Sequence, residues 1–86
     1  MNQTKKICVI GLGYIGLPTA ALLANRGYSV HGVDVVASTV DIINQGKIHI
    51  VEPDLDTFVR AAVNSGNLKA SLTPDIADVF IIAVPT

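Results

Sequence analysis

The sequence predicts an α/β domain: a parallel sheet of strand order 3-2-1-4 with helices on both faces. Three observations support this class. Short apolar runs alternate with amphipathic stretches, glycines stand where these segments meet, and 86 residues suffice for one domain at most. Half of the residues are hydrophobic and only 15% are charged, a composition that excludes disorder. Strand–helix–strand crossovers are right-handed in nearly all known proteins, so a parallel arrangement is expected.

The first third of the chain predicts a strand, a helix and a second strand. Residues 6–10 are β-rich and end at a glycine, as suits a buried parallel strand. Residues 14–26 predict a helix that ends at Gly27, with small residues four apart that let it press against the sheet. Residues 28–34 form the second predicted strand.

The middle of the chain predicts two more helices. Ser38 would cap a short helix that runs through residue 44. Residues 47–52 alternate as a strand does, yet Pro53 and the acids after it are typical of a first helical turn. Glu52 would cap that helix, or reach a ligand. The helix would run to about residue 64, and its expected inner face consists of Leu55, Phe58, Val59 and Ala62.

The last part of the chain predicts two strands, residues 68–71 and residues 79–84. Between them Thr73 would cap a brief helical turn with Pro74 at its first position. The final strand is the most apolar one in the chain and would leave an open edge. Such an edge favours self-association.

Gly11, Gly13 and Gly16 form a G-x-G-x-x-G pattern between the first predicted strand and the helix after it. In dinucleotide-binding proteins the first glycine makes a tight turn, the second admits a pyrophosphate, and the third lets helix and strand pack closely. Asp34 ends the second strand about 20 residues further on, where this pattern places a carboxylate for the adenine ribose. The combination predicts a Rossmann-type NAD site at the start of the helix.

The choice of cofactor follows from the same acid. Asp34 would repel the extra phosphate of NADP, and the next three residues offer no Arg or Lys to accept it, so NAD is favoured. A flavin-binding version of the fold and a purely structural role for the glycines stay open. Thr86 follows the last strand, where this fold places cofactor contacts, and is explained equally well as a terminal loop residue.

Charge, hydropathy and cysteine content argue against other classes. The net charge is −1 and the basic residues are scattered, so no nucleic-acid surface is expected. Glycines and a proline interrupt the apolar run after Lys6, which argues against a signal peptide or membrane anchor and for a cytoplasmic protein. Cys8 lies inside a strand and is expected to be buried. His31 and His49 lack partners at ligand spacing, so no metal site is expected.

The run VIGLGYIGLPTAALLANRGYSVHGVD, residues 9–34, resembles the opening of the UDP-glucose/GDP-mannose dehydrogenase family. Residues 48–55 and 82–86 are similar to the branch that oxidises UDP-N-acetyl-D-mannosamine. The resemblance spans the whole chain but only the start of such an enzyme. Residues 1–86 are therefore expected to be the N-terminal part of an NAD-binding Rossmann domain, with the remainder of the enzyme absent.

This resemblance implies an NAD-dependent oxidation of the C6 alcohol of UDP-N-acetyl-D-mannosamine to the carboxylate. Each turnover would consume two NAD, and the product would feed surface polysaccharide such as enterobacterial common antigen. The family's catalytic cysteine lies far downstream, so the chain is expected to hold no catalytic residue and to be inactive alone, whereas its parent is expected to be a homodimer. The implied NAD contacts are Tyr14, Ile15, Asp34 and Thr86, with Gly11, Gly13 and Gly16 shaping the loop.

Three alternatives stay open. The parent could oxidise UDP-glucose or another UDP-sugar, since every residue that selects the sugar lies beyond Thr86. A hydroxyacid or 6-phosphogluconate-type dehydrogenase shares the glycine pattern but is not expected to carry residues 50–55 (IVEPDL). A non-enzymatic module that senses NAD would use the same fold.

Overall fold

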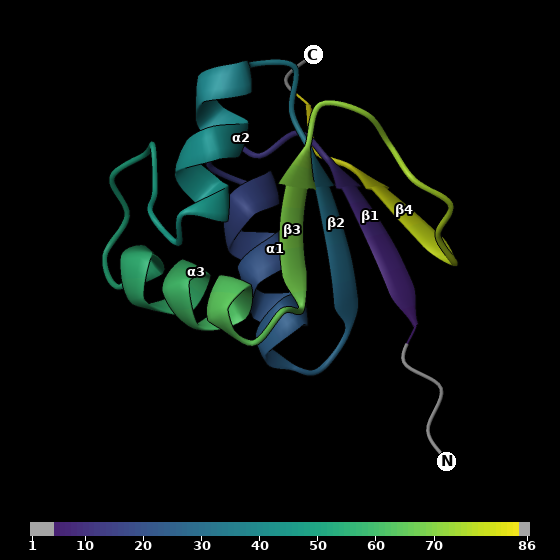
Figure 1. Ribbon diagram of the computed structural model, residues 1–86, viewed down its shortest axis with the longest axis horizontal. Coiled ribbons are helices and arrows are strands. Elements are labelled where there is room, and N and C mark those ends of the chain that lie inside the picture. The colour runs from purple at the N-terminus through teal and green to yellow at the C-terminus, as the bar shows by residue number, and fades with distance from the viewer. Residues whose placement is uncertain (1–4, 85–86) are drawn as a thin grey trace.

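The computed structural model describes residues 5–84. Four parallel strands form one sheet in the order β3-β2-β1-β4 (Figure 1). The strands are β1 (Lys6–Ile10), β2 (Ser29–Val33), β3 (Leu68–Ser71) and β4 (Val79–Ile82). The helices are α1 (Gly16–Asn25), α2 (Ala37–Asn44) and α3 (Leu55–Asn64). The predicted Rossmann-type sheet and its strand order are confirmed.

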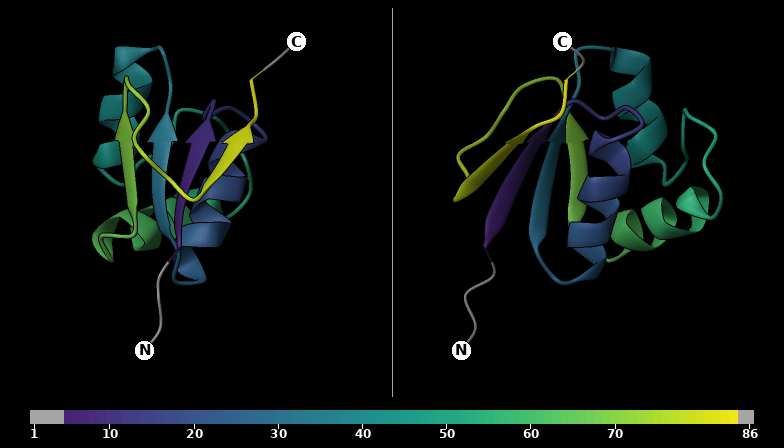
Figure 2. Two further views of the ribbon diagram at one scale, coloured as in Figure 1. Left: turned by 90° about the vertical axis from the view of Figure 1, so that its right-hand side faces the viewer. Right: turned by 180° about the vertical axis from the view of Figure 1, so that it is seen from behind.

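The three helices lie against one face of the sheet, and the segment that joins β3 to β4 crosses the other face (Figure 2). Helix α1 contacts all three of β1, β2 and β3, and α3 packs on α1 and β3. Of the helices expected on both faces, residues 5–84 supply those of one face. The hydrophobic core accordingly lies between the sheet and this single helical layer.

The core is built from alternate residues of the strands and from the inner stripes of the helices. Ile7 and Val9 of β1 and Val30 of β2 point into it, as the period of two in a strand requires. From α1 comes Leu17, whose complete burial contributes about 2 kcal/mol to stability. The buried small residues of α1 lie on the same side and let it approach the sheet.

Both helices after β2 begin at other residues than the sequence indicated. Ser38 lies inside α2 rather than capping it, because the Val40 N–H that a Ser38 cap would bind donates instead to the Val36 carbonyl, at 3.2 Å. The next helix begins at Leu55, not at Pro53, and no side chain caps it. Its Leu55 N–H donates to the Glu52 carbonyl, while Asp54 has a left-handed φ of 64° that no helical residue adopts.

In this region one strand-like pattern forms no strand, and the prediction that Phe58 faces inward is wrong. Residues 47–52 form no strand, although Ile48 and Ile50 pack against the core at the expected spacing of two. Phe58 is 54% exposed rather than internal. The buried stripe of α3 runs through Leu55 and Val59, and Phe58 lies at its edge, where its carbonyl accepts the side-chain amide of α1 residue Asn25.

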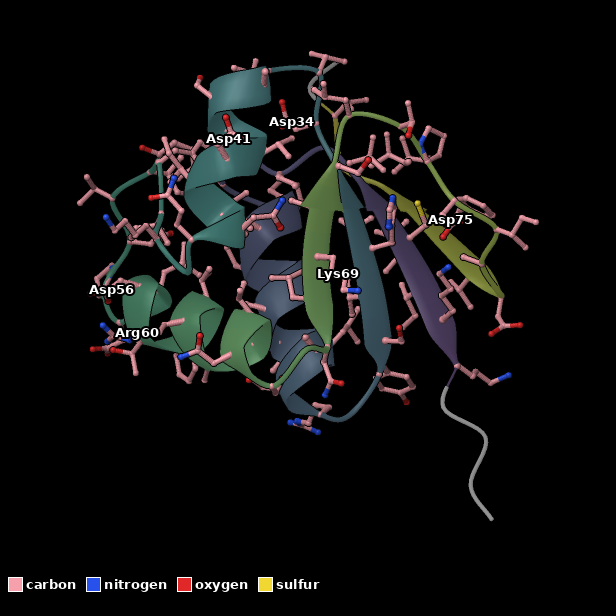
Figure 3. All side chains as sticks on the ribbon, viewed as in Figure 1. Asp34, Asp41, Asp56, Arg60, Lys69 and Asp75 are labelled. Carbon is pink, nitrogen blue, oxygen red and sulfur yellow. The ribbon has the colours of Figure 1, made fainter. Side chains whose placement is uncertain are left out.

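The segment between β3 and β4 contains no helical turn, so the prediction for Thr73 and Pro74 is wrong. It runs over the sheet and is held there by side chains of the sheet. His31 of β2 makes a hydrogen bond of 2.9 Å with the Thr73 carbonyl, and Lys6 of β1 forms an ion pair with Asp75. Asp75 lies in the segment between β3 and β4 (Figure 3). The Lys6 ammonium lowers the pKa of the Asp75 carboxyl. These contacts hold the segment extended.

Strand β4 ends at Ile82, two residues earlier than predicted, and forms an open edge because it pairs only with β1 among the described strands. Phe80 and Ile82 are exposed, as expected of that edge. Cys8 is buried and forms no disulfide. None of the helices in residues 5–84 is both long and apolar enough to cross a membrane.

Candidate cofactor-binding site

A cavity of about 660 Å³ opens at the carboxyl ends of β1, β2 and β4. Its wall is formed by residues 10–15, residues 33–35 and residues 82–84. Ligands of open parallel sheets bind outside the carboxyl ends of the strands, at the point where the strand order reverses. In this sheet that point lies at β1, because β2 and β3 follow on one side of it and β4 lies on the other.

Gly11 and Gly16 give the loop after β1 its shape. Gly11 has a φ of +99° and donates its N–H to the Val33 carbonyl at 2.8 Å, which ties the turn to β2. A Cβ atom on Gly11 would lie 2.9 Å from the Ala83 carbonyl group. A Cβ on Gly16 would lie 1.6 Å from the Gly11 carbonyl oxygen. Only glycine fits either position, as expected for the tight turn and the close packing.

The second glycine of the loop stands in open space. A Cβ on Gly13 would meet no atom within 4 Å, and Gly13 lines the cavity. Within residues 5–84, the N–H groups of Gly13, Tyr14 and Ile15 have no acceptor. Carbonyls of the same loop accept the first helical hydrogen bonds, such as the 3.0 Å bond from Leu17 to Gly13. The start of α1 therefore presents free donors and a positive dipole end, the combination that binds phosphates.

Asp34 lies directly beside this loop, at the end of β2 (Figure 3). Its Oδ2 atom accepts the Leu12 N–H at 3.1 Å, and its Oδ1 atom accepts the Val36 N–H at 3.0 Å. Each carboxylate oxygen can accept a second hydrogen bond, so both retain capacity for the hydroxyls of a ligand. The sequence pattern indicated the acid but gave no signal that it also fastens the loop.

Of the other predicted contact residues, two line the cavity. Tyr14 and Ile15 line the cavity, and their side chains are 63% and 72% exposed at its rim. Thr86 lies outside the described residues. Glu52 lies away from this cavity, in a second groove of about 430 Å³ beside Phe58, so it reaches no ligand here. In the described part of the chain, no three His, Cys, Asp or Glu side chains gather as metal ligands would.

The sequence model of the UDP-glucose/GDP-mannose dehydrogenase family, NAD binding domain, matches residues 5–86. The chain belongs to this family. The UDP-glucose/GDP-mannose dehydrogenase family uses NAD, and the matched region is the domain that binds it. The cavity and its glycine loop therefore lie in the part of the family's fold that takes the cofactor.

Curated members of the UDP-glucose/GDP-mannose dehydrogenase family align along nearly the whole chain. The UDP-N-acetyl-D-mannosamine dehydrogenase of Campylobacter jejuni is 65% identical over 86 residues, which are 100% of this chain and 21% of that protein. The NDP-N-acetyl-D-galactosaminuronic acid dehydrogenase of Ralstonia nicotianae is 62% identical over 82 residues, 95% of this chain and 19% of that protein. The chain thus spans about a fifth of the length of these family members.

Solved structures of the same family share the fold. The UDP-N-acetyl-mannosamine dehydrogenase of Staphylococcus aureus superposes with a TM-score of 0.91 at 51% identity, covering 94% of this chain and 19% of that one. A ternary complex of GDP-mannose dehydrogenase from Pseudomonas aeruginosa gives a TM-score of 0.87 at 40% identity, covering 93% and 19%.

Proposed function

We propose that this chain is the NAD-binding portion of a nucleotide-sugar 6-dehydrogenase that oxidises UDP-N-acetyl-D-mannosamine to its uronate. The observation that carries the proposal is the shared cavity wall, where free loop N–H groups and the Asp34 carboxylate stand side by side. The loop N–H groups suit a pyrophosphate, and the carboxylate suits the hydroxyls of a ribose. Together they match two neighbouring polar parts of one dinucleotide.

Each residue of the site then has a distinct task. The N–H groups of Gly13, Tyr14 and Ile15 bind the pyrophosphate, and Asp34 accepts the adenine-ribose hydroxyls. Gly11 and Gly16 serve cofactor binding by holding the loop in the shape that exposes those donors. Thr86, which follows β4, contributes a further NAD contact. When bound, NAD supplies the hydride acceptor for the oxidation.

The proposed reaction of the parent enzyme converts the C6 alcohol of the sugar to a carboxylate with two NAD, each of which accepts one hydride. Its product serves surface polysaccharide synthesis, such as that of enterobacterial common antigen, in the cytoplasm of the cell. Nucleophile and substrate recognition come from outside residues 1–86, and the chain alone is inactive. The parent acts as a homodimer. Identity of 65% to a UDP-N-acetyl-D-mannosamine dehydrogenase supports this choice of sugar.

A second candidate function is the oxidation of another nucleotide sugar, because a relative named for N-acetyl-D-galactosaminuronic acid is almost equally similar, at 62% identity. The family match favours either sugar over a hydroxyacid substrate and over a non-enzymatic sensor. Assaying the full-length parent with UDP-N-acetyl-D-mannosamine, UDP-N-acetyl-D-galactosamine and UDP-glucose, while following NADH formation, decides among them. The highest kcat/KM is expected for UDP-N-acetyl-D-mannosamine, and a higher value for either other sugar refutes that assignment.

The cofactor preference is testable on the chain of residues 1–86. Calorimetry is expected to show NADP binding at least about 100-fold more weakly than NAD, because its 2′-phosphate meets the Asp34 carboxylate. Val36→Arg, at an exposed position next to the cavity, is expected to reduce the difference in affinity between NAD and NADP, because the arginine supplies a cation for the 2′-phosphate. Equal affinities of the unchanged chain for NAD and NADP would show that Asp34 does not face the ribose.

The open edge of β4 gives a prediction about the chain in solution. We expect concentration-dependent self-association in light scattering, because β4 leaves one row of backbone groups unpaired and exposes Ile82. Ile82→Lys is expected to suppress it. Ile76→Lys, the same change at another exposed isoleucine that lies outside the strand, is the control and is expected to leave self-association intact. A single monomeric species at high concentration would contradict this prediction.

A further inference from the structure

Leu12, the first variable residue of the glycine pattern, is held in place through both its main chain and its side chain. Its side chain is completely buried and belongs to the hydrophobic core, unlike the exposed side chains of Tyr14 and Ile15 in the same loop. Its N–H donates to the Asp34 carboxylate at 3.1 Å. The main chain and the side chain of Leu12 are thus both held by the segment at the end of β2.

The space for this side chain exists because β2 carries a glycine. A Cβ atom on Gly32 would lie 2.9 and 3.0 Å from the two δ-carbons of Leu12 and 3.4 Å from its Cγ. Since both methyl groups are equally close, exchanging them by rotation brings no relief. Gly32 pairs with Val9 of β1 and Ala70 of β3 in ordinary strand backbone. Gly32 is therefore required for room and not for an unusual conformation.

Three consecutive residues at the end of β2 therefore contact the loop and fix its position. Gly32 receives the Leu12 side chain, the Val33 carbonyl accepts the Gly11 N–H at 2.8 Å, and Asp34 accepts the Leu12 N–H. The donors assigned to the pyrophosphate begin at the next residue along the chain. A shift of Leu12 moves those donors relative to Asp34, since one peptide unit is rigid.

We propose that Leu12 and Gly32 are positioning residues, which fix the distance between the phosphate-binding N–H groups and the ribose-binding carboxylate without touching NAD. This proposal rests on the NAD site proposed above. It gives the fully buried position of the glycine pattern a function in cofactor binding beyond its share in the core. Small displacements of positioned groups have large effects on binding and reaction.

The test is a compensating pair of substitutions in the chain of residues 1–86. Gly32→Ala is expected to weaken NAD binding on the order of tenfold, equivalent to one lost hydrogen bond, and to shift the amide NMR signals of Gly13 and Tyr14. Adding Leu12→Val removes about the volume that Ala introduced, and is expected to return both affinity and signals towards their original values. Val59→Ala, fully buried in α3, is the control that lowers stability and leaves NAD affinity unchanged.

The proposal is overturned if Gly32→Ala leaves affinity and amide signals as they were, if the double variant restores neither, or if Val59→Ala weakens NAD binding as much. Should Gly32→Ala fail to fold, Leu12→Ala empties the same contact and is expected to weaken NAD binding similarly; unchanged affinity then refutes the proposal. If the unchanged chain binds no NAD, the NAD site is wrong, and the amide signals of Gly13 and Tyr14 still decide whether this contact positions the loop.

Discussion

Gly16→Ala is expected to destabilise the domain by at least about 4 kcal/mol, enough to unfold a marginally stable chain of this size. The added Cβ would lie 1.6 Å from the Gly11 carbonyl oxygen, a backbone atom that cannot rotate away. Gly11 in turn cannot retreat, because its N–H is bonded to Val33 and Ala83 lies against it. Urea unfolding followed by circular dichroism measures the loss.

Gly13→Ala is the matched control, since it adds the same methyl group in the same loop, at a position that faces open space. No atom lies within 4 Å of its Cβ position, so the free energy of unfolding is expected to change by less than about 1 kcal/mol. NAD binding is nevertheless expected to weaken, because the methyl group occupies the approach to the loop N–H groups. Unfolding of Gly16→Ala at the same urea concentration as the unchanged chain would contradict the observed packing.

Asp34→Ala is expected to weaken NAD binding about 100-fold, the largest effect on affinity of any substitution considered. The variant loses the ribose acceptor and two internal acceptors at once. The N–H groups of Leu12 and Val36 both lose their partner, so the loop and the start of α2 are released together. Calorimetric titration with NAD measures the affinity.

Asp34→Asn separates the two tasks of this residue. Asparagine keeps one oxygen in nearly the same place, so one of the two internal hydrogen bonds survives, while its amide nitrogen cannot accept the other. We expect stability between those of Asp34→Ala and the unchanged chain, with NAD affinity still reduced by roughly tenfold because the charge is lost. Unaltered NAD binding by Asp34→Ala would remove the ribose assignment altogether.

Much of the fold was predictable because the decisive signals are local. The strand at residues 6–10 and the strand at residues 68–71 match β1 and β3 to the residue. An apolar run that ends at a glycine marks the first, and apolar residues that alternate with polar ones mark the second. The nearness of Asp34 to the glycine loop was also predictable. It follows from the parallel pairing of β1 and β2, whose carboxyl ends must meet at one edge of the sheet.

What sequence patterns missed depends on contacts between distant residues. Ser38 looks like a cap, but α2 already begins at Ala37, after a turn in which Asp34, itself bonded to Leu12, accepts the Val36 N–H. Thr73 looks like a cap until His31 and Lys6 hold its segment extended. The space that Gly32 leaves for Leu12 joins residues twenty positions apart and has no signature along the chain. In each case a tertiary partner overrides a local preference.

The two main-chain bonds to Asp34 have a thermodynamic consequence. Because Leu12 and Val36 already hold both oxygens, the side chain has lost its rotational freedom before any ligand arrives. That loss is part of the conformational entropy of folding and is not repeated when a dinucleotide enters. The site is therefore preorganised, and its affinity is expected to come from contacts made rather than from disorder overcome.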